Sequence, residues 1–127
     1  MEIDLERVHD VLDDDGSVDG QLRVLVDRLW PRGVRKDRLV HDRWDKDVAP
    51  STELRKAFHG GDLGFEAFAE RYRAELAQSG AAEALLAAAR EAGSERLSLL
   101  YAAADAEQNH ALVLREVLEE TQGSRDG

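Results

Sequence analysis

The chain has 127 residues, which suits one domain, and 43% of them are hydrophobic, enough to bury a core. Its net charge is −10 and it contains no cysteine, which excludes disulfides, thiol catalysis and thiolate metal sites. No apolar run approaches the length of a membrane span, and the acidic start Met-Glu-Ile-Asp is unlike a signal peptide, so we expect a soluble cytoplasmic protein.

The charge is unevenly distributed along the chain. Residues 28–56 carry nine Lys or Arg and five Asp or Glu, so this segment is +4 and the remainder is −14. An acidic body argues against non-specific nucleic-acid binding, which depends on neutralising phosphates with Lys and Arg. The local excess of arginine still permits one small anion site, although any single one of these residues can be an ordinary solvated surface charge.

Two strands are expected in the first thirty residues. Apolar residues alternate loosely over Ile3–Val11, which predicts a short strand at a sheet edge. Leu22–Arg28 is the stronger strand, because its run of three apolar β-formers predicts burial on both faces. Pro31 lacks the N–H that a ladder needs, so this strand ends before it.

The middle of the chain predicts helices. A short helix is expected over Lys36–Val40. A longer one follows the N-cap Ser51 and ends at Gly60, since serine accepts from free N–H groups and glycine tolerates a helix end. Two further helices are predicted over Gly64–Gln78 and Ala81–Ala92, with apolar residues at helical spacing.

A second buried strand, Leu97–Ala103, precedes the last predicted helix at about Ala106–Glu120, with Asp105 as its N-cap and Gln108 at the third helical position. The element order predicts a single compact α/β domain over residues 1–120. Its small, mostly parallel sheet has about three strands, covered by four to five helices. Residues 121–127 are polar and predict a flexible C-terminal tail.

The connection between the two buried strands predicts where a site lies. A long helical crossover joins them, so they should run parallel and end at the same edge of the sheet. Asp27 and Arg28 should then emerge beside residues 105–110. Open parallel sheets bind ligands outside the carboxyl ends of their strands, so this edge is the predicted site.

Two arginines are the predicted anion ligands. Arg28 and Arg32 can bind a phosphate or carboxylate through forked hydrogen bonds, and the free N–H groups of a helix start add to this. The predicted ligand-binding residues are Arg28, Trp30, Arg32, Tyr101 and Asn109.

Three residues are predicted to carry catalysis. His110 can act as a general acid or base because histidine ordinarily titrates near neutrality, and Asp27 or Asp105 can act as a base or orient the imidazole. Each has a structural alternative: a helix cap for Asp105, a satisfied buried histidine for His110, and an ion pair for Asp27 with Arg28. The convergence of these polar residues at one edge favours the functional interpretation.

Other functional signatures are missing. The sequence has no glycine-rich phosphate loop, no GxSxG elbow and no HExxH motif. The four histidines are too scattered to predict a metal site, and no cofactor is indicated. Nothing matches a helix-turn-helix or an aromatic RNA-binding motif.

Several motifs spread along the chain carry a resemblance to a known family. They are Leu25-Val26-Asp27-Arg28-Leu29-Trp30-Pro31-Arg32-Gly33, Trp44, Ala49-Pro50-Ser51, Glu53-Leu54-Arg55-Lys56, Phe58, Phe68-x-x-Arg71-Tyr72-x-x-Glu75-Leu76, Leu99-Leu100-Tyr101-Ala102-Ala103, Asp105 and Asn109-His110-Ala111. Together they resemble the YeaO-like proteins, domain of unknown function 488, over about residues 3–119.

The resemblance implies a small single-domain bacterial-type α/β protein and supplies no reaction. Ala104 departs from the pattern, because the resemblance implies a basic residue there. If that residue contacts a ligand in relatives, the contact is lost here. Such proteins are sometimes labelled transcriptional regulators, and the charge distribution gives that label no support.

The leading hypothesis is an anion-binding pocket at the strand ends. It would hold a small phosphorylated or nucleotide-like metabolite, on which a hydrolase or lyase could act. The alternative is a non-catalytic ligand-binding or protein-interaction module that uses the same pocket. A nucleic-acid-binding regulator is the least favoured hypothesis.

Overall fold

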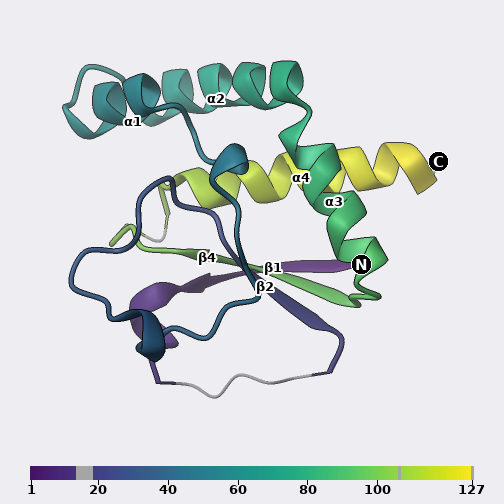
Figure 1. Cartoon of the computed structure of the whole chain (residues 1–127). Helices are drawn as coiled ribbons and strands as arrows, with labels where there is room; N and C mark the ends of the chain where they lie inside the picture. The colour runs from purple at the N-terminus through teal and green to yellow at the C-terminus, as the bar shows by residue number, and fades with distance from the viewer. Residues whose placement is uncertain (14–18, 106, 127) are drawn as a thin grey trace.

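Four parallel strands form one sheet, in the order β1-β4-β2-β3 (Figure 1). The computed structural model describes residues 1–13, 19–105 and 107–126. The predicted α/β fold with a small parallel sheet is therefore confirmed, and one further strand completes it. The strands are β1 Glu2–Arg7, β2 Gln21–Leu25, β3 Arg43–Trp44 and β4 Arg96–Tyr101.

Strand β4 is central, because it pairs with both β1 and β2. Leu97 lies opposite Ile3 on one side and Leu22 on the other. All residues of β4 after Arg96 are buried. A continuous run of residues that favour burial is what a strand covered on both faces requires.

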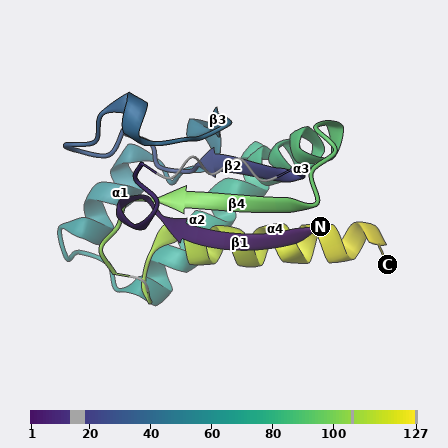
Figure 2. The same cartoon turned by 90° about the horizontal axis from the view of Figure 1, so that it is seen from below.

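Helices cover one face of this sheet. Figures 1 and 2 show α2, α3 and α4 on the same side, with α4 running along β1 and β4. Among the described residues, no helix combines the length and apolarity needed to cross a bilayer. The helices are α1 Thr52–His59, α2 Phe65–Ser79, α3 Ala81–Glu91 and α4 His110–Asp126.

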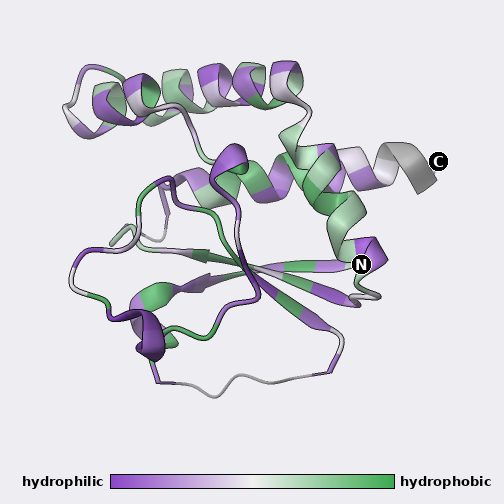
Figure 3. Cartoon of the chain, in the orientation of Figure 1, coloured by the Kyte–Doolittle hydropathy of each residue, from purple (hydrophilic) through white to green (hydrophobic). Residues whose placement is uncertain are grey.

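The main core lies between the sheet and these helices. Leu97 and Leu99 point into it from β4, while Leu100, with the opposite orientation, joins a smaller cluster on the other face. The hydropathy colouring shows apolar residues alternating along the strands (Figure 3). Burying one such leucine contributes about 1.5–3 kcal/mol to the free energy of unfolding. The two clusters therefore stabilise the sheet from both of its faces.

The loop after β2 has its own packing. Trp30 Nε1 donates to the Val34 carbonyl over 2.7 Å, and the rings of Trp30 and Trp44 meet edge to face at 5.5 Å. The ammonium of Lys46 lies 4.2 Å from the centre of the Trp44 ring, a cation–π contact. The predicted short helix after this loop is present as a 3-10 helix over Lys36–Arg38.

Helix α4 begins later than predicted, so the prediction of Asp105 as its N-cap is wrong. Asp105 Oδ1 instead accepts from the N–H groups of Glu107 and Gln108, which forms a turn ahead of the helix. Asn109 Oδ1 accepts from Leu112 N, the contact that an N-cap makes. The helix also continues to Asp126, through the stretch predicted as a tail.

Candidate functional site

A cavity of about 350 Å³ lies at the carboxyl edge of the sheet. The segments that follow β2 and β4 form part of its wall, and the start of α4 and one side of α1 complete it. This is the edge at which open parallel sheets bind ligands. The wall is made by residues 27–32, Pro50, Arg55, Phe58, His59, Phe68, 102–103 and 108–110.

The structure brings six of the eight predicted site residues together on this wall: Asp27, Arg28, Trp30, Arg32, Asn109 and His110. Parallel pairing of β2 with β4 makes this possible, because it places both strand ends at one edge. The other two lie off the wall. Tyr101 is 6% exposed and belongs to the main core, and Asp105 is exposed on the turn before α4.

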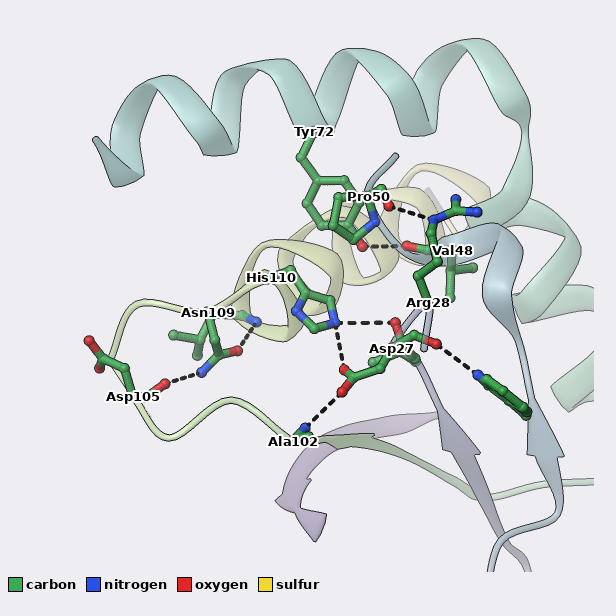
Figure 4. Close-up of polar contacts among 12 residues, drawn as sticks. Asp27, Arg28, Val48, Pro50, Tyr72, Ala102, Asp105, Asn109 and His110 are labelled. Carbon is green, nitrogen blue, oxygen red and sulfur yellow. Dashed lines mark hydrogen bonds and ion pairs between the residues drawn. The ribbon is translucent and has the colours of Figure 1, made fainter. Parts of the chain in front are cut away.

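The Asp27 carboxylate joins three elements (Figure 4). Its Oδ2 accepts from the Ala102 N–H over 3.1 Å, which ties the end of β2 to the end of β4. Its Oδ1 lies 3.1 Å from Nε2 of His110, the first residue of α4. The Trp44 indole donates to the Asp27 carbonyl over 2.7 Å, so both the backbone and the side chain of this residue are fixed.

The orientation of the His110 ring follows from its contacts. Nε2 lies 3.1 Å from the Val26 carbonyl, and a carbonyl can only accept, so Nε2 carries the proton. The same nitrogen is within ion-pair distance of Asp27 Oδ1, although that oxygen has no hydrogen-bond partner among the described residues. Figure 4 shows the other ring nitrogen, Nδ1, directed away from Asp27. No described residue hydrogen-bonds to it, so it remains available to a ligand.

The wall is strongly basic for a protein of net charge −10. Its described residues include five basic side chains and one acid, Asp27. Such a concentration of one sign favours anions. The basic residues are Arg28, Arg32, Arg55, His59 and His110.

Arg28 and Arg55 have N–H groups for which no hydrogen-bond acceptor is described. Arg28 Nε donates to the Pro50 carbonyl over 2.9 Å, which fixes its guanidinium and leaves the two terminal nitrogens without a described hydrogen bond. Arg55 Nε is buried and has no hydrogen-bond partner among the described residues. Arg28 also borders a smaller hollow with Glu75, whose carboxylate is occupied by the backbone N–H and hydroxyl of Ser51.

Helix α1 supplies wall residues that were not predicted from the sequence. Arg55, Phe58 and His59 lie at i, i+3 and i+4, so they share one face of the helix. The sequence predicted the helix but not that this face of it lines the cavity. The available signal was the arginine and histidine that lie beside Phe58 on this face.

Tyr72 lies close to the site as a structural residue. Burial raises the pKa of its phenol well above the usual value, and the nearby carboxylates of Glu75 and Asp27 raise it further. The hydroxyl donates to the Val48 carbonyl. Tyr72 therefore stays a neutral donor that ties α2 to the segment before α1.

Fold and site together define a small α/β domain with a basic cavity at the carboxyl edge of a parallel sheet. The chain belongs to the YeaO-like family, domain of unknown function 488. A family model described as "Inactive DUF488-N3 subclade" matches residues 2–127.

Two relatives support this assignment. The uncharacterised protein YeaO of Escherichia coli is 49% identical over 118 residues, covering 93% of this chain and 97% of the relative. An uncharacterised protein of Mycobacterium tuberculosis is 43% identical over 113 residues, covering 88% and 89%. No solved structure gives a significant match.

Proposed function

We propose that this protein binds a small anionic ligand, a phosphate or carboxylate, in the carboxyl-edge cavity without converting it. The observation that carries the proposal is Arg55, a residue of the cavity wall whose buried Nε has no hydrogen-bond partner among the described residues. Guanidinium forks fit the oxygens of phosphate and carboxylate in geometry and in charge. Arg32, which is more exposed, adds positive charge at the same wall.

The wall lacks hydroxyl and amine nucleophiles, which supports binding without conversion. None of its described residues is a serine, threonine, lysine or tyrosine. The end of β4 contributes only the methyl groups of Ala102 and Ala103. The description of the matching family model as an inactive subclade agrees with this interpretation.

Titration with inorganic phosphate and with acetate tests the proposal. We expect millimolar phosphate or acetate to raise the melting temperature of the wild type, because a ligand that binds only the folded state stabilises it. Arg55→Ala should weaken binding about tenfold or more, the effect of losing a charge-assisted hydrogen bond. Arg28→Ala should weaken binding less, with some loss of stability because the Pro50 carbonyl loses its donor.

Arg90→Ala is the matched control. Arg90 is exposed at the end of α3 and away from the cavity wall, so its replacement removes the same charge without touching the site. This variant should bind like the wild type. If neither anion shifts the melting temperature of the wild type, or if Arg90→Ala loses binding as fully as Arg55→Ala, the anion site is refuted.

Proton transfer by His110 and Asp27 is the second candidate function. The supporting observation is the ring geometry: Nε2 is held by Val26 and Asp27, while Nδ1 is left for a substrate. This arrangement suits a general base in a hydrolase or lyase acting on a phosphorylated or nucleotide-like metabolite. A turnover screen should then find an activity that His110→Ala and Asp27→Asn both abolish while the variants stay folded. Unchanged turnover in both would remove the assignment.

A further inference from the structure

Several polar atoms on the cavity wall are already hydrogen-bonded within the protein. Asn109 Nδ2 donates to the Asp105 carbonyl and its Oδ1 accepts from Leu112 N, so both polar atoms of its amide are hydrogen-bonded. Trp30 Nε1 is bonded to Val34, and Asp27 Oδ2 to Ala102. Asn109 and Trp30 therefore shape the site and have little hydrogen-bonding capacity left for a ligand, whereas Asp27 Oδ1 is buried and has no hydrogen bond among the described residues.

The remaining polar atoms differ in kind. Arg32 and Arg55 offer N–H groups without a described hydrogen bond, which suit an anionic group. His110 Nδ1 offers a lone pair when the ring is neutral, because the ring proton is held on Nε2 by the Val26 carbonyl. Donors therefore come from the loop after β2 and from α1, while this acceptor comes from the start of α4. A ligand that complements both must be an acceptor at one point and a donor at another.

Apart from polar residues such as His59 and Gln108, much of the rest of the wall is apolar, which limits the skeleton of a ligand that joins these two points. Phe58 and Phe68 stack with ring centres 4.4 Å apart, and Pro50 and Ala103 contribute further carbon surface. A cavity of about 350 Å³ is at the small end of ligand sites, which span roughly 300–1,000 Å³. These features fit a ligand with a short carbon skeleton.

We infer that the ligand of this cavity carries a hydrogen-bond donor, a hydroxyl or an N–H, close to its anionic group. Hydroxylated phosphate esters and hydroxy acids share this chemistry. The inference rests on the proposed anion site and adds to it: Arg55, with Arg32, holds the anionic group, and His110 Nδ1 accepts from the ligand's donor. A site built to accept a hydroxyl discriminates against the analogue that lacks it.

Matched ligand pairs test the inference by calorimetric titration at pH 8, where histidine is ordinarily neutral. Glycerol 3-phosphate is compared with propyl phosphate, and lactate with propionate, so that the two arms separate a phosphate from a carboxylate ligand. In the pair whose anionic group matches the natural ligand, glycerol 3-phosphate or lactate should bind about three- to tenfold more tightly than its analogue without the hydroxyl, as one added hydrogen bond allows.

His110→Gln should abolish this preference while anion binding persists, since the amide can still donate to Val26 but presents no Nδ1. His9→Gln is the control, because His9 is exposed and lies outside the cavity wall. Should His110→Gln fail to fold, nitrogen NMR of the wild-type histidines replaces it. The His110 Nδ1 resonance should then shift with the hydroxylated ligand and not with its partner.

The outcomes separate the two proposals. If anions bind and neither pair shows a preference for the hydroxyl, the inference is wrong and the anion site stands. If a preference exists and survives in folded His110→Gln, the assignment to His110 is wrong. If no ligand of either pair binds and phosphate does not bind, the proposed function itself fails.

Discussion

Strands β2 and β4 are neighbours in the sheet, yet their carboxyl ends carry opposite kinds of chemistry. The residues after β2 include Asp27, Arg28 and Arg32, whereas those after β4 are Ala102 and Ala103. Both ends line the same cavity. One strand end provides charge and the other provides space, and a pocket for a small molecule needs both.

The two ends meet in one hydrogen bond. The Ala102 N–H belongs to the strand end without functional side chains, and it positions the Asp27 carboxylate of the other end. The end of β4 thus contributes to the site through its backbone N–H and not through a functional side chain. The contrast between the two ends can be tested by altering each of them separately.

Replacing a core residue of β4 should have the largest effect, because the positions of both strand ends depend on this central strand. Leu99 is fully buried in the main core, so Leu99→Ala should lower the free energy of unfolding by about 2–5 kcal/mol. Urea denaturation measures this. Leu29→Ala is the control, since Leu29 is 59% exposed and should change stability by less than about 0.5 kcal/mol. A small effect of Leu99→Ala would mean that β4 does not anchor the sheet.

Removing the link between the two ends should have the next largest effect. Asp27→Ala leaves the Ala102 N–H without its acceptor and should lower the free energy of unfolding by about 1–3 kcal/mol. Asp27→Asn keeps an acceptor oxygen and should recover part of this loss. If the two variants are equally destabilised, the hydrogen bond to Ala102 is not the contact that matters.

Filling the space at the end of β4 should affect binding more than stability. Ala103 is half-buried on the cavity wall, so Ala103→Leu should occupy the cavity and weaken phosphate binding about tenfold. Its melting temperature without ligand should stay close to that of the wild type. Phosphate titration of both proteins checks this, and undiminished binding by the variant would show that the ligand lies elsewhere.

The smallest effect is expected beside the end of β2. Asp45 N donates to the Leu25 carbonyl, and burial raises the pKa of the Asp45 carboxyl above its ordinary value of 3.8. The folded state then holds this proton more tightly than the unfolded state, so stability falls as pH rises upward from about 3.8.

Asp45→Asn removes this titration. Above that pH window the variant should equal or exceed the wild type in stability, by no more than about 0.5 kcal/mol. Thermal unfolding between pH 3 and pH 7 provides the measurement. A variant that loses stability at neutral pH would show that the charge of Asp45 is favourable, contrary to the expected sign.

The fold was largely predictable because its signals are local. The apolar run of β4 and the spacing in α2 and α3 follow directly from burial and helical periodicity. Strand β3 was not predictable, since it has two residues, Arg43 and Trp44, and exists through pairing with β2. The start of α4 was misplaced because Asp105 and Asn109 both suit a cap, and only the three-dimensional contacts choose between them.

The site was partly predictable because parallel strands end at one edge. That rule places Asp27 and Arg28 with His110, and the structure brings all three onto one wall. The contribution of α1 depends on how that helix packs over the edge, which no local pattern specifies, so Arg55 was missed. The anion and acid/base roles of these residues remain predictions.

The central position of β4 also determines when this protein can fold as it leaves the ribosome. Its partner β1 lies 94 residues earlier in the chain, and β2 has only the two-residue β3 beside it until β4 emerges. The growing chain therefore carries unpaired strand edges until residue 101 has been made, a state in which chains are prone to aggregate. The cavity first exists after β4 has entered the middle of the sheet and the lining residues up to His110 have followed it.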